Sequence, residues 1–109
     1  MSFNNFVKSV LDPIGVPVSY ITYTGTASQY IVFNEWNIPA LHADDQEKQT
    51  DYTVQVDVFS TGNFISLVDQ VKDRMTAAGF IRILEESEYI EEKKIFRKIL
   101  RFRYVKEVE

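Results

Sequence analysis

Few side chains in this sequence have the type and spacing that catalysis or metal binding requires. The only histidine is His42, and it lies close to Asp44, Asp45 and Glu47. An imidazole and several carboxylates can bind a cation, but this group lacks the spacing of an EF-hand loop and offers one imidazole. A catalytic His42 needs a positioned nucleophile and an orienting group, and the sequence indicates neither. We therefore expect a solvated segment here, with no metal and no cofactor.

Other catalytic patterns are missing as well. The chain has no cysteine, which excludes a thiol nucleophile, a thiolate metal site and a disulfide. Its four glycines form no phosphate-binding loop. Nothing around the glutamates of residues 85–92 indicates a pocket for an acid–base pair. The sequence predicts no enzymatic activity.

Charge is concentrated in two neighbouring stretches near the C-terminus. Glutamates crowd residues 85–92, whereas residues 93–106 contain seven of the twelve basic residues and no acid. A hairpin turn centred between these stretches places Glu88 opposite Arg97. Such cross-strand ion pairs help to set the register of a hairpin. One interpretation of the charge pattern is therefore a set of pairs within the chain.

The basic row outnumbers the glutamates available to it. In the same register, Arg101 and Arg103 face Leu84 and Arg82, which offer no carboxylate. A second interpretation is therefore an interaction strip formed with Arg97, which meets an acidic surface of another subunit or phosphate groups. Basic side chains on an edge strand also prevent unwanted strand pairing.

The segment from Tyr52 to Ala78 predicts how the chain folds. Residues 52–60 alternate apolar and polar side chains, which is typical of a strand with one buried face. The period then becomes helical, with an apolar stripe formed by Phe64, Leu67, Val68, Val71, Met75 and Ala78. We expect this helix to pack on the apolar face of the preceding strand.

Shorter signals place the other elements. The expected helices are 3–11 and 64–78, and the expected strands are 16–23, 29–37, 52–60, 80–88 and 95–106. Asn63, or Thr61 in its place, is the expected cap of the second helix. The order α-β-β-β-α-β-β predicts a two-layer α+β fold with both helices on one face of a mostly antiparallel sheet. The polar segment 41–49 is expected to be a long mobile loop.

Length and composition set further bounds. A chain of 109 residues indicates a single domain, 1–109. The net charge of −4 does not favour binding to nucleic acid through a broad basic surface. No apolar run is long enough to cross a membrane. Trp36, at the end of an expected strand, either packs at the sheet edge or serves as an anchor at a subunit contact.

The segment Tyr30–Phe33, a polar loop, the strand Tyr52–Ser60 and an amphipathic helix together resemble the tail terminators. These are small tail-completion proteins of long-tailed phages and prophages. The resemblance covers about residues 15–105, and Val54–Phe59 with the following helix is its most specific part. It implies a non-enzymatic α+β protein that forms a ring, typically a hexamer, on the end of the tail tube.

The resemblance also implies partners and a location. The chain would contact itself, the tail-tube protein and a head-completion or connector protein. It would act in the host bacterial cytoplasm during assembly and remain at the head-proximal end of the virion tail. Alternatives are a head–tail connector, a minor tail protein, an enzyme of unrecognised type and a small nucleic-acid-binding module. The last rests on the aromatic residues Phe96, Phe102 and Tyr104, which alternate with the basic row.

The resemblance supplies no site motif, so the interface residues are our own expectation. A ring subunit needs two different and complementary flanks. The acidic flank is expected to consist of Asp44, Asp45, Glu47 and Asp51, and the basic flank of Arg97, Arg101 and Arg103. Trp36 is the candidate anchor.

Overall fold

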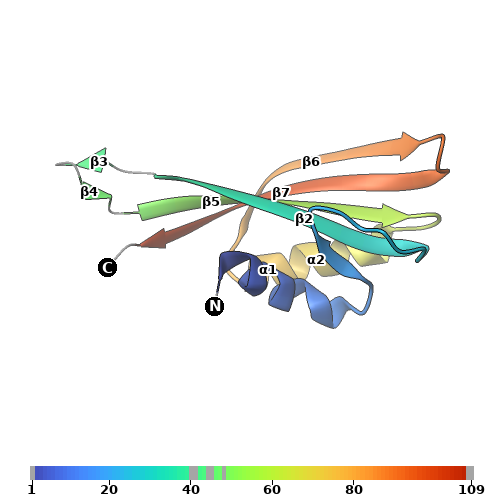
Figure 1. Cartoon of the computed structure of the whole chain (residues 1–109), viewed down its shortest axis with the longest axis horizontal. Helices are drawn as coiled ribbons and strands as arrows, with labels where there is room; N and C mark the ends of the chain where they lie inside the picture. The colour runs from blue at the N-terminus through green and yellow to red at the C-terminus, as the bar shows by residue number, and fades with distance from the viewer. Residues whose placement is uncertain (1, 40–41, 44–45, 48, 108–109) are drawn as a thin grey trace.

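Two helices cover one face of a five-stranded sheet, and the sheet continues well past them on one side (Figure 1). The computed structural model describes residues 2–39, 42–43, 46–47 and 49–107, with side chains described for 2–37 and 51–105. The helices are α1 (Phe3–Leu11) and α2 (Ile65–Ala77), with a 3-10 turn at Asp12–Ile14. The strands are β1 (Val18–Tyr20), β2 (Gln29–Pro39), β3 (His42–Ala43), β4 (Gln46–Glu47), β5 (Gln49–Ser60), β6 (Ile81–Ile90) and β7 (Ile95–Glu107). The predicted α+β fold is confirmed.

The strand order in the main sheet is β1-β2-β5-β7-β6. All neighbouring pairs are antiparallel except β1 and β2, which run parallel because the chain returns along residues 21–28 before it re-enters the sheet. Ile21 begins this return with a φ of 71°. This left-handed conformation costs a β-branched residue about 1–3 kcal/mol. It ends β1 at Tyr20, earlier than the expected strand 16–23.

The central strand β5 shows how one face of the sheet is buried from solvent. Its register places Val56 opposite Phe33 of β2 and Leu100 of β7. All three side chains are at most 1% exposed. Burying a side chain of this size stabilises the fold by about 1.5–3 kcal/mol. The predicted apolar face of the strand is confirmed.

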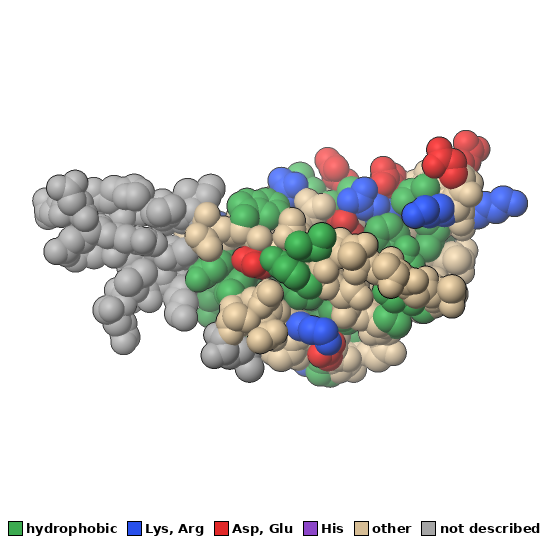
Figure 2. Space-filling view, viewed as in Figure 1, with side chains coloured by type: hydrophobic (Ala, Val, Ile, Leu, Met, Phe, Trp, Pro, Cys, Tyr) green, Lys and Arg blue, Asp and Glu red, His purple; other side chains and the backbone are tan. Residues whose placement is uncertain are grey.

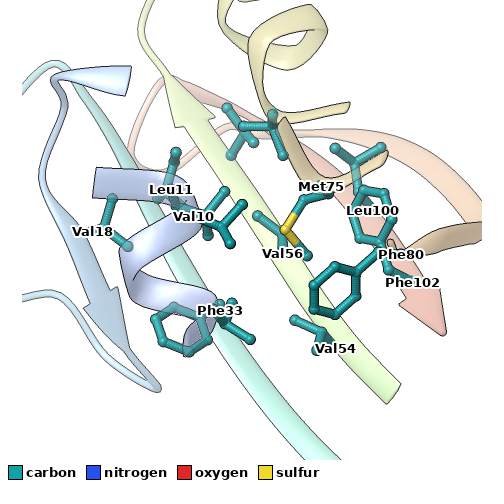
Figure 3. Packing of buried hydrophobic residues seen from close by; sticks show 14 of the residues in the cluster. Val10, Leu11, Val18, Phe33, Val54, Val56, Met75, Phe80, Leu100 and Phe102 are labelled. Carbon is teal, nitrogen blue, oxygen red and sulfur yellow. The ribbon is translucent and has the colours of Figure 1, made fainter. Parts of the chain in front are cut away.

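Helix α2 forms the opposite wall of the core. Its buried side chains are Leu67, Val68, Val71 and Met75, the stripe that the sequence predicted. Figure 3 shows Met75 pointing toward β5, beside Val56 and Phe80. The helix thus packs on the strand that precedes it, and its i, i+3, i+4 spacing decides which side chains are buried.

Side-chain hydrogen bonds begin both helices. The Asn5 N–H of α1 donates to Ser2 Oγ at 3.3 Å. The Ile65 N–H of α2 donates to Asn63 Oδ1 at 2.9 Å. Asn63 thus contacts the first turn, but it is not the predicted cap, because the helix begins one residue later than expected and Phe64 is in the N-cap position. Gly79, with a φ of 100°, ends α2 as predicted, because this conformation favours a residue without a Cβ.

An aromatic cluster packs α1 against the sheet at the place where the sheet extends beyond the helices. Phe3 stacks on Tyr52 of β5 with ring centroids 3.8 Å apart. Phe6 stacks on Phe80 at 5.9 Å, and Tyr104 of β7 lies 4.8 Å from Phe80. Each such pair adds about 0.5–1.5 kcal/mol beyond its buried area. The cluster therefore fastens β5 and β7 to α1 at the edge of the core.

Beyond the cluster, three strands continue as a ribbon, which we call the arm: residues 37–39 of β2, 49–52 of β5 and 104–107 of β7. It leads to the small β3–β4 hairpin, and the molecule is 52 Å long as a result (Figure 1). β1 ends at Tyr20, which pairs with Phe33 of β2, and β6 begins at Ile81, which pairs with Arg103 of β7. Neither strand therefore extends into the arm. Pro39 fits at the end of β2 because β2 is an edge strand there.

The arm corrects the prediction of a long loop at 41–49. His42–Ala43 pairs antiparallel with Gln46–Glu47, and β5 already begins at Gln49. A strand ladder is held by backbone N–H and C=O groups, which do not depend on alternating side chains. The absence of an apolar pattern therefore misled the prediction.

The β6–β7 hairpin has the predicted register near its turn, with Glu88 opposite Arg97. A β-bulge after Arg82 then shifts the pairing, so Arg103 faces Ile81. The predicted Arg82–Arg103 pair is wrong because the bulge adds one residue to β6.

Candidate interaction surface

In the described part of the chain, no helix and no second sheet covers the face of the sheet opposite the helices (Figure 1). Of the described segments, only the one that follows β1 crosses it, where Tyr23 stacks on Tyr30. Because side chains alternate along a strand, the residues between the buried valines of β5 point to this side. We call it the outer face. It carries Asp51, Thr53, Gln55, Asp57 and Phe59 of β5 and Arg97, Ile99, Arg101 and Arg103 of β7.

The outward arginines of β7 bind polar side chains of β5. Arg97 donates to Asp57 Oδ2 at 2.8 Å and to Glu88 of β6 at 2.9 Å. Further along, Arg103 donates to Asp51 Oδ2 at 2.8 Å. Of the two interpretations of the basic row, pairing within the chain therefore holds for Arg97 and Arg103.

The two ion pairs that join β7 to β5 differ in their surroundings. Asp57 is 13% exposed and Arg97 28%, whereas Arg103 is 49% exposed. Burial opposes the charge of Arg97, but the hydrogen bonds that Arg97 donates to Asp57 and Glu88 outweigh it and raise the pKa of Arg97. The exposed Arg103 pair is screened by water and contributes at most about 1 kcal/mol.

Arg101 is the exception in the row. Its Nη2 donates to the neutral Gln55 Oε1 at 2.8 Å, and no described carboxylate forms an ion pair with it. Its guanidinium lies 5.5 Å from the ring centroid of Trp36, which is 38% exposed. The Arg101 Nε is buried and has no hydrogen-bond partner among the described atoms. An uncompensated arginine on a half-exposed tryptophan is the composition typical of an interface hot spot.

A second cluster on the outer face is aromatic. Tyr23 stacks on Tyr30 at 4.1 Å, and Tyr30 stacks on Phe59 at 4.7 Å. The Arg97 guanidinium lies 5.9 Å from the Phe59 ring centroid. Burial, and then the neighbouring Tyr23, raise the pKa of Tyr30. The stack borders a shallow depression of about 280 Å³ that Lys93 also lines.

The structure places the residues that the sequence proposed for an interface, and their role as an interface stays a prediction. The predicted residues whose side chains are described all lie on the outer face: Trp36, Asp51, Arg97, Arg101 and Arg103. Asp44 and Asp45 fall outside the described residues, and only the backbone of Glu47 is described. Asp51 was expected on a flank separate from the arginines, but it pairs with Arg103 of the same chain.

The sequence prediction missed a third charged cluster, on the helix side of the sheet. Lys72 of α2 and Lys98 of β7 each lie 2.8 Å from a carboxylate oxygen of Glu85, and Arg82 contacts the same carboxylate. The hydrogen bonds from Lys72, and then from Lys98, lower the pKa of Glu85 to about 2. Lys98 lies two residues before Leu100 and therefore shares its face of β7. This alternation could have predicted that Lys98 points to the helix side, away from the outward arginines.

No group of three or more His, Cys, Asp or Glu side chains in the described part of the chain is placed to hold a metal ion. Within the same residues, neither helix has the length and apolar character needed to cross a membrane.

Comparison with solved structures shows where this fold occurs. The chain aligns with a chain from a structure described as the virion of a native gene transfer agent particle, at a TM-score of 0.61 and 14% sequence identity. The alignment covers 94% of this chain and 84% of that one. A second solved structure, which carries no functional name, aligns over 98% of this chain and 88% of its own, at a TM-score of 0.55 and 11% identity. No protein-family model and no curated protein sequence matches the chain. At these identities, the likeness shows a shared fold.

Proposed function

We propose that this chain is a structural protein of a phage or phage-like virion. The observation that carries the proposal is the fold shared over nearly the whole length with a chain of a gene transfer agent virion. The resemblance of residues 15–105 to tail-completion proteins points to the same class of particle. The function proposed is therefore assembly through surfaces, without turnover of a substrate.

Within that class, the role we propose is that of a tail terminator. The chain would form a ring, a hexamer, on the end of the tail tube, stop tube growth and offer a docking face to the head-completion or connector protein. It would act in the bacterial cytoplasm during assembly and remain at the head-proximal end of the tail. Two features support this role: a sheet with two different edges and an arm that extends past the body.

The outer face is the proposed contact with the tube or with the neighbouring subunit. Trp36 and Arg101 lie at its centre and combine a half-exposed aromatic ring with a charge that no described carboxylate neutralises. Asp44, Asp45 and Glu47, which lie between β2 and β5 in the sequence, are retained as proposed contacts of the arm.

The test is tube capping. The purified chain is mixed with the tail-tube protein of the same particle and imaged by negative stain. Tubes of one length with a capped end are expected, and bare tubes of unregulated length would contradict the role. The double variant R101E/R103E should weaken capping because it reverses the charge of the outer face. The matched control is K8E on α1, which changes an exposed charge on the opposite side and should leave capping intact.

A head–tail connector or minor tail protein is supported by the same likeness to a virion chain. Labelling the chain in whole particles distinguishes these roles, because a terminator lies at the tube end nearest the head. A nucleic-acid-binding module has less support, since Phe102 is fully buried and Tyr104 packs in the aromatic cluster beside α1. Phe96 is 37% exposed, but it lies on the helix side, next to Phe64. None of the three rings is available to stack bases on the outer face. A salt-dependent gel shift checks this point.

A further inference from the structure

The two edges of the main sheet both expose large apolar side chains. On the β6 edge, Ile81 is 64% exposed and Ile83 is 52% exposed. On the β1 edge, Tyr20 is 39% exposed and Ile21 is 60% exposed. Single exposed aliphatic residues are ordinary, but neighbouring pairs at both ends of one sheet are typical of contact surfaces.

The β6 edge is positively charged on its helix side. Lys72, Lys98 and Arg82 share the single carboxylate of Glu85, which leaves two positive charges uncompensated in this cluster. Lys72 and Arg82 also line a depression of about 260 Å³ beside α2. The next acid of β6, Glu86, pairs with Ile99 and so belongs to the outer face. Figure 2 shows acidic and basic side chains gathered over β6 and β7 at the upper right.

The β1 edge carries the opposite charge. Glu35 of β2 accepts a hydrogen bond from the Tyr20 hydroxyl at 3.0 Å, which raises the pKa of Tyr20. No described basic side chain forms an ion pair with Glu35. Beside it, Ile21 is held in a left-handed conformation with its side chain in solvent. A strained β-branched residue that exposes its apolar side chain indicates a functional constraint.

The two edges are aligned with each other across the sheet. Glu35 pairs with Val54, Val54 with Phe102, and Phe102 with Arg82, so Glu35 and Arg82 are the two ends of one cross-strand row. Both ends belong to the helix side, because Val54 and Phe102 are buried beneath the helices. When a second copy lies beside the first so that its sheet continues this row, Arg82 of one molecule lies next to Glu35 of the other.

We propose that the β6 edge of one copy binds the β1 edge of a second copy, with Arg82 and Lys72 facing Glu35 and with Ile81 and Ile83 packing on Ile21. The contact joins two different surfaces, so it repeats from copy to copy and closes into a ring when the rotation permits. It rests on the proposed ring for its setting. It also replaces the expected pairing of an acidic segment with Arg97 and Arg103, whose guanidiniums are bound within the chain.

Disulfide trapping tests this contact, because the natural chain has no cysteine. The double variant I21C/I83C is oxidised at increasing protein concentration. Four strand spacings separate β1 from β6, about 19 Å, so no disulfide can form within one chain. A covalent ladder of dimer, trimer and higher species is expected. The matched control I65C/I83C replaces an equally exposed isoleucine on α2 and should give no ladder.

A charge exchange tests the ionic part of the contact. In the I21C/I83C background, R82E and E35R should each lower the yield of the ladder about tenfold, because like charges then face each other. The combination R82E/E35R restores the attraction and should recover most of the yield. Failure of this rescue would reject the Arg82–Glu35 pairing.

The outcomes separate the contact from the proposed function. Trapping captures weak contacts, so a ladder no stronger than the I65C/I83C control would overturn the inference, whether or not the wild-type chain caps tubes. A ladder together with tubes of unregulated length would support the contact and reject the terminator role.

Discussion

The two faces of β5 contrast strongly although they share one backbone. On the helix side, Val54, Val56 and Val58 are fully buried. On the outer face, Gln55 and Asp57 are only partly covered and are bound by arginines of β7. The difference shows that the helix layer, and not the strand ladder, decides which side chains carry the stability of the fold. The outer face is free to carry polar contacts because little stability depends on it.

The sharpest test of this contrast uses neighbouring residues of β7 that point to opposite faces. Leu100 is fully buried, whereas Ile99 belongs to the outer face. L100A should lower the free energy of unfolding by about 2–5 kcal/mol, because it removes buried methyl groups and leaves a cavity. I99A should lower it by less than half of that amount. Urea denaturation measures both, and equal losses would mean that the outer face is packed as tightly as the core.

A smaller effect is expected within the arginine row. D57N removes the least exposed carboxylate and leaves Arg97 with Glu88 alone, which should cost about 1–2 kcal/mol. D51N breaks the more exposed pair with Arg103 and should cost less than about 1 kcal/mol. The same urea series compares them. A larger loss for D51N than for D57N would show that the Arg103–Asp51 pair is the better buried of the two.

The pH dependence of stability compares the helix-side cluster with the outer row. The pKa of Glu85 is lowered to about 2 in the folded chain, whereas the same side chain has a pKa near 4.5 in the unfolded chain. Between these two pH values the unfolded chain therefore binds more protons than the folded chain. The stabilisation is thus present above pH 4.5 and is lost as the pH falls toward 2. Because Glu85 is 27% exposed, solvent screening limits the loss to about 1–2 kcal/mol.

The variant E85Q isolates this term. It removes the ionisable group, so the difference in unfolding free energy between the variant and the wild type should shrink as the pH falls from 5 to 2. A difference that stays constant over this range would contradict the assigned ion pairs with Lys72 and Lys98.

The smallest effect on stability is expected at Trp36. W36A removes a ring that is already 38% exposed and should change the unfolding free energy by less than about 1 kcal/mol. Capping of tail tubes should nevertheless be lost if the outer face makes the contact. Trp36 is also the only tryptophan, so its fluorescence should shift to the blue on binding. An unchanged spectrum in capped tubes would place the contact elsewhere.

The sequence predicted the parts of the fold that side-chain periodicity controls. The alternation of β5 and the helical stripe of α2 each follow from which face is buried, so both were predictable. The expected strand 29–37 was likewise close to its observed bounds. The arm was missed because its ladder depends on backbone groups, and the parallel pairing of β1 was missed because it depends on the conformation of Ile21.

The face on which the candidate residues lie was predictable from the sequence, but their pairing was not. Strand alternation correctly placed Arg97, Arg101 and Arg103 on one face. Their partners Asp57 and Asp51 lie on β5, which joins β7 only after the chain has passed through α2 and β6. The pairing is therefore set by strand order, which a single sequence does not show.

The arm has a mechanical consequence. The three strands that form it are continuous with the strands that hold the core, and the stacked rings of Phe3 and Tyr52 lie at their common root. The ribbon is therefore a lever with its fulcrum beside α1. A force on the far end of the arm is transmitted to the body through the hydrogen bonds of the ladders. Binding at that end therefore exerts a torque on the hydrophobic core.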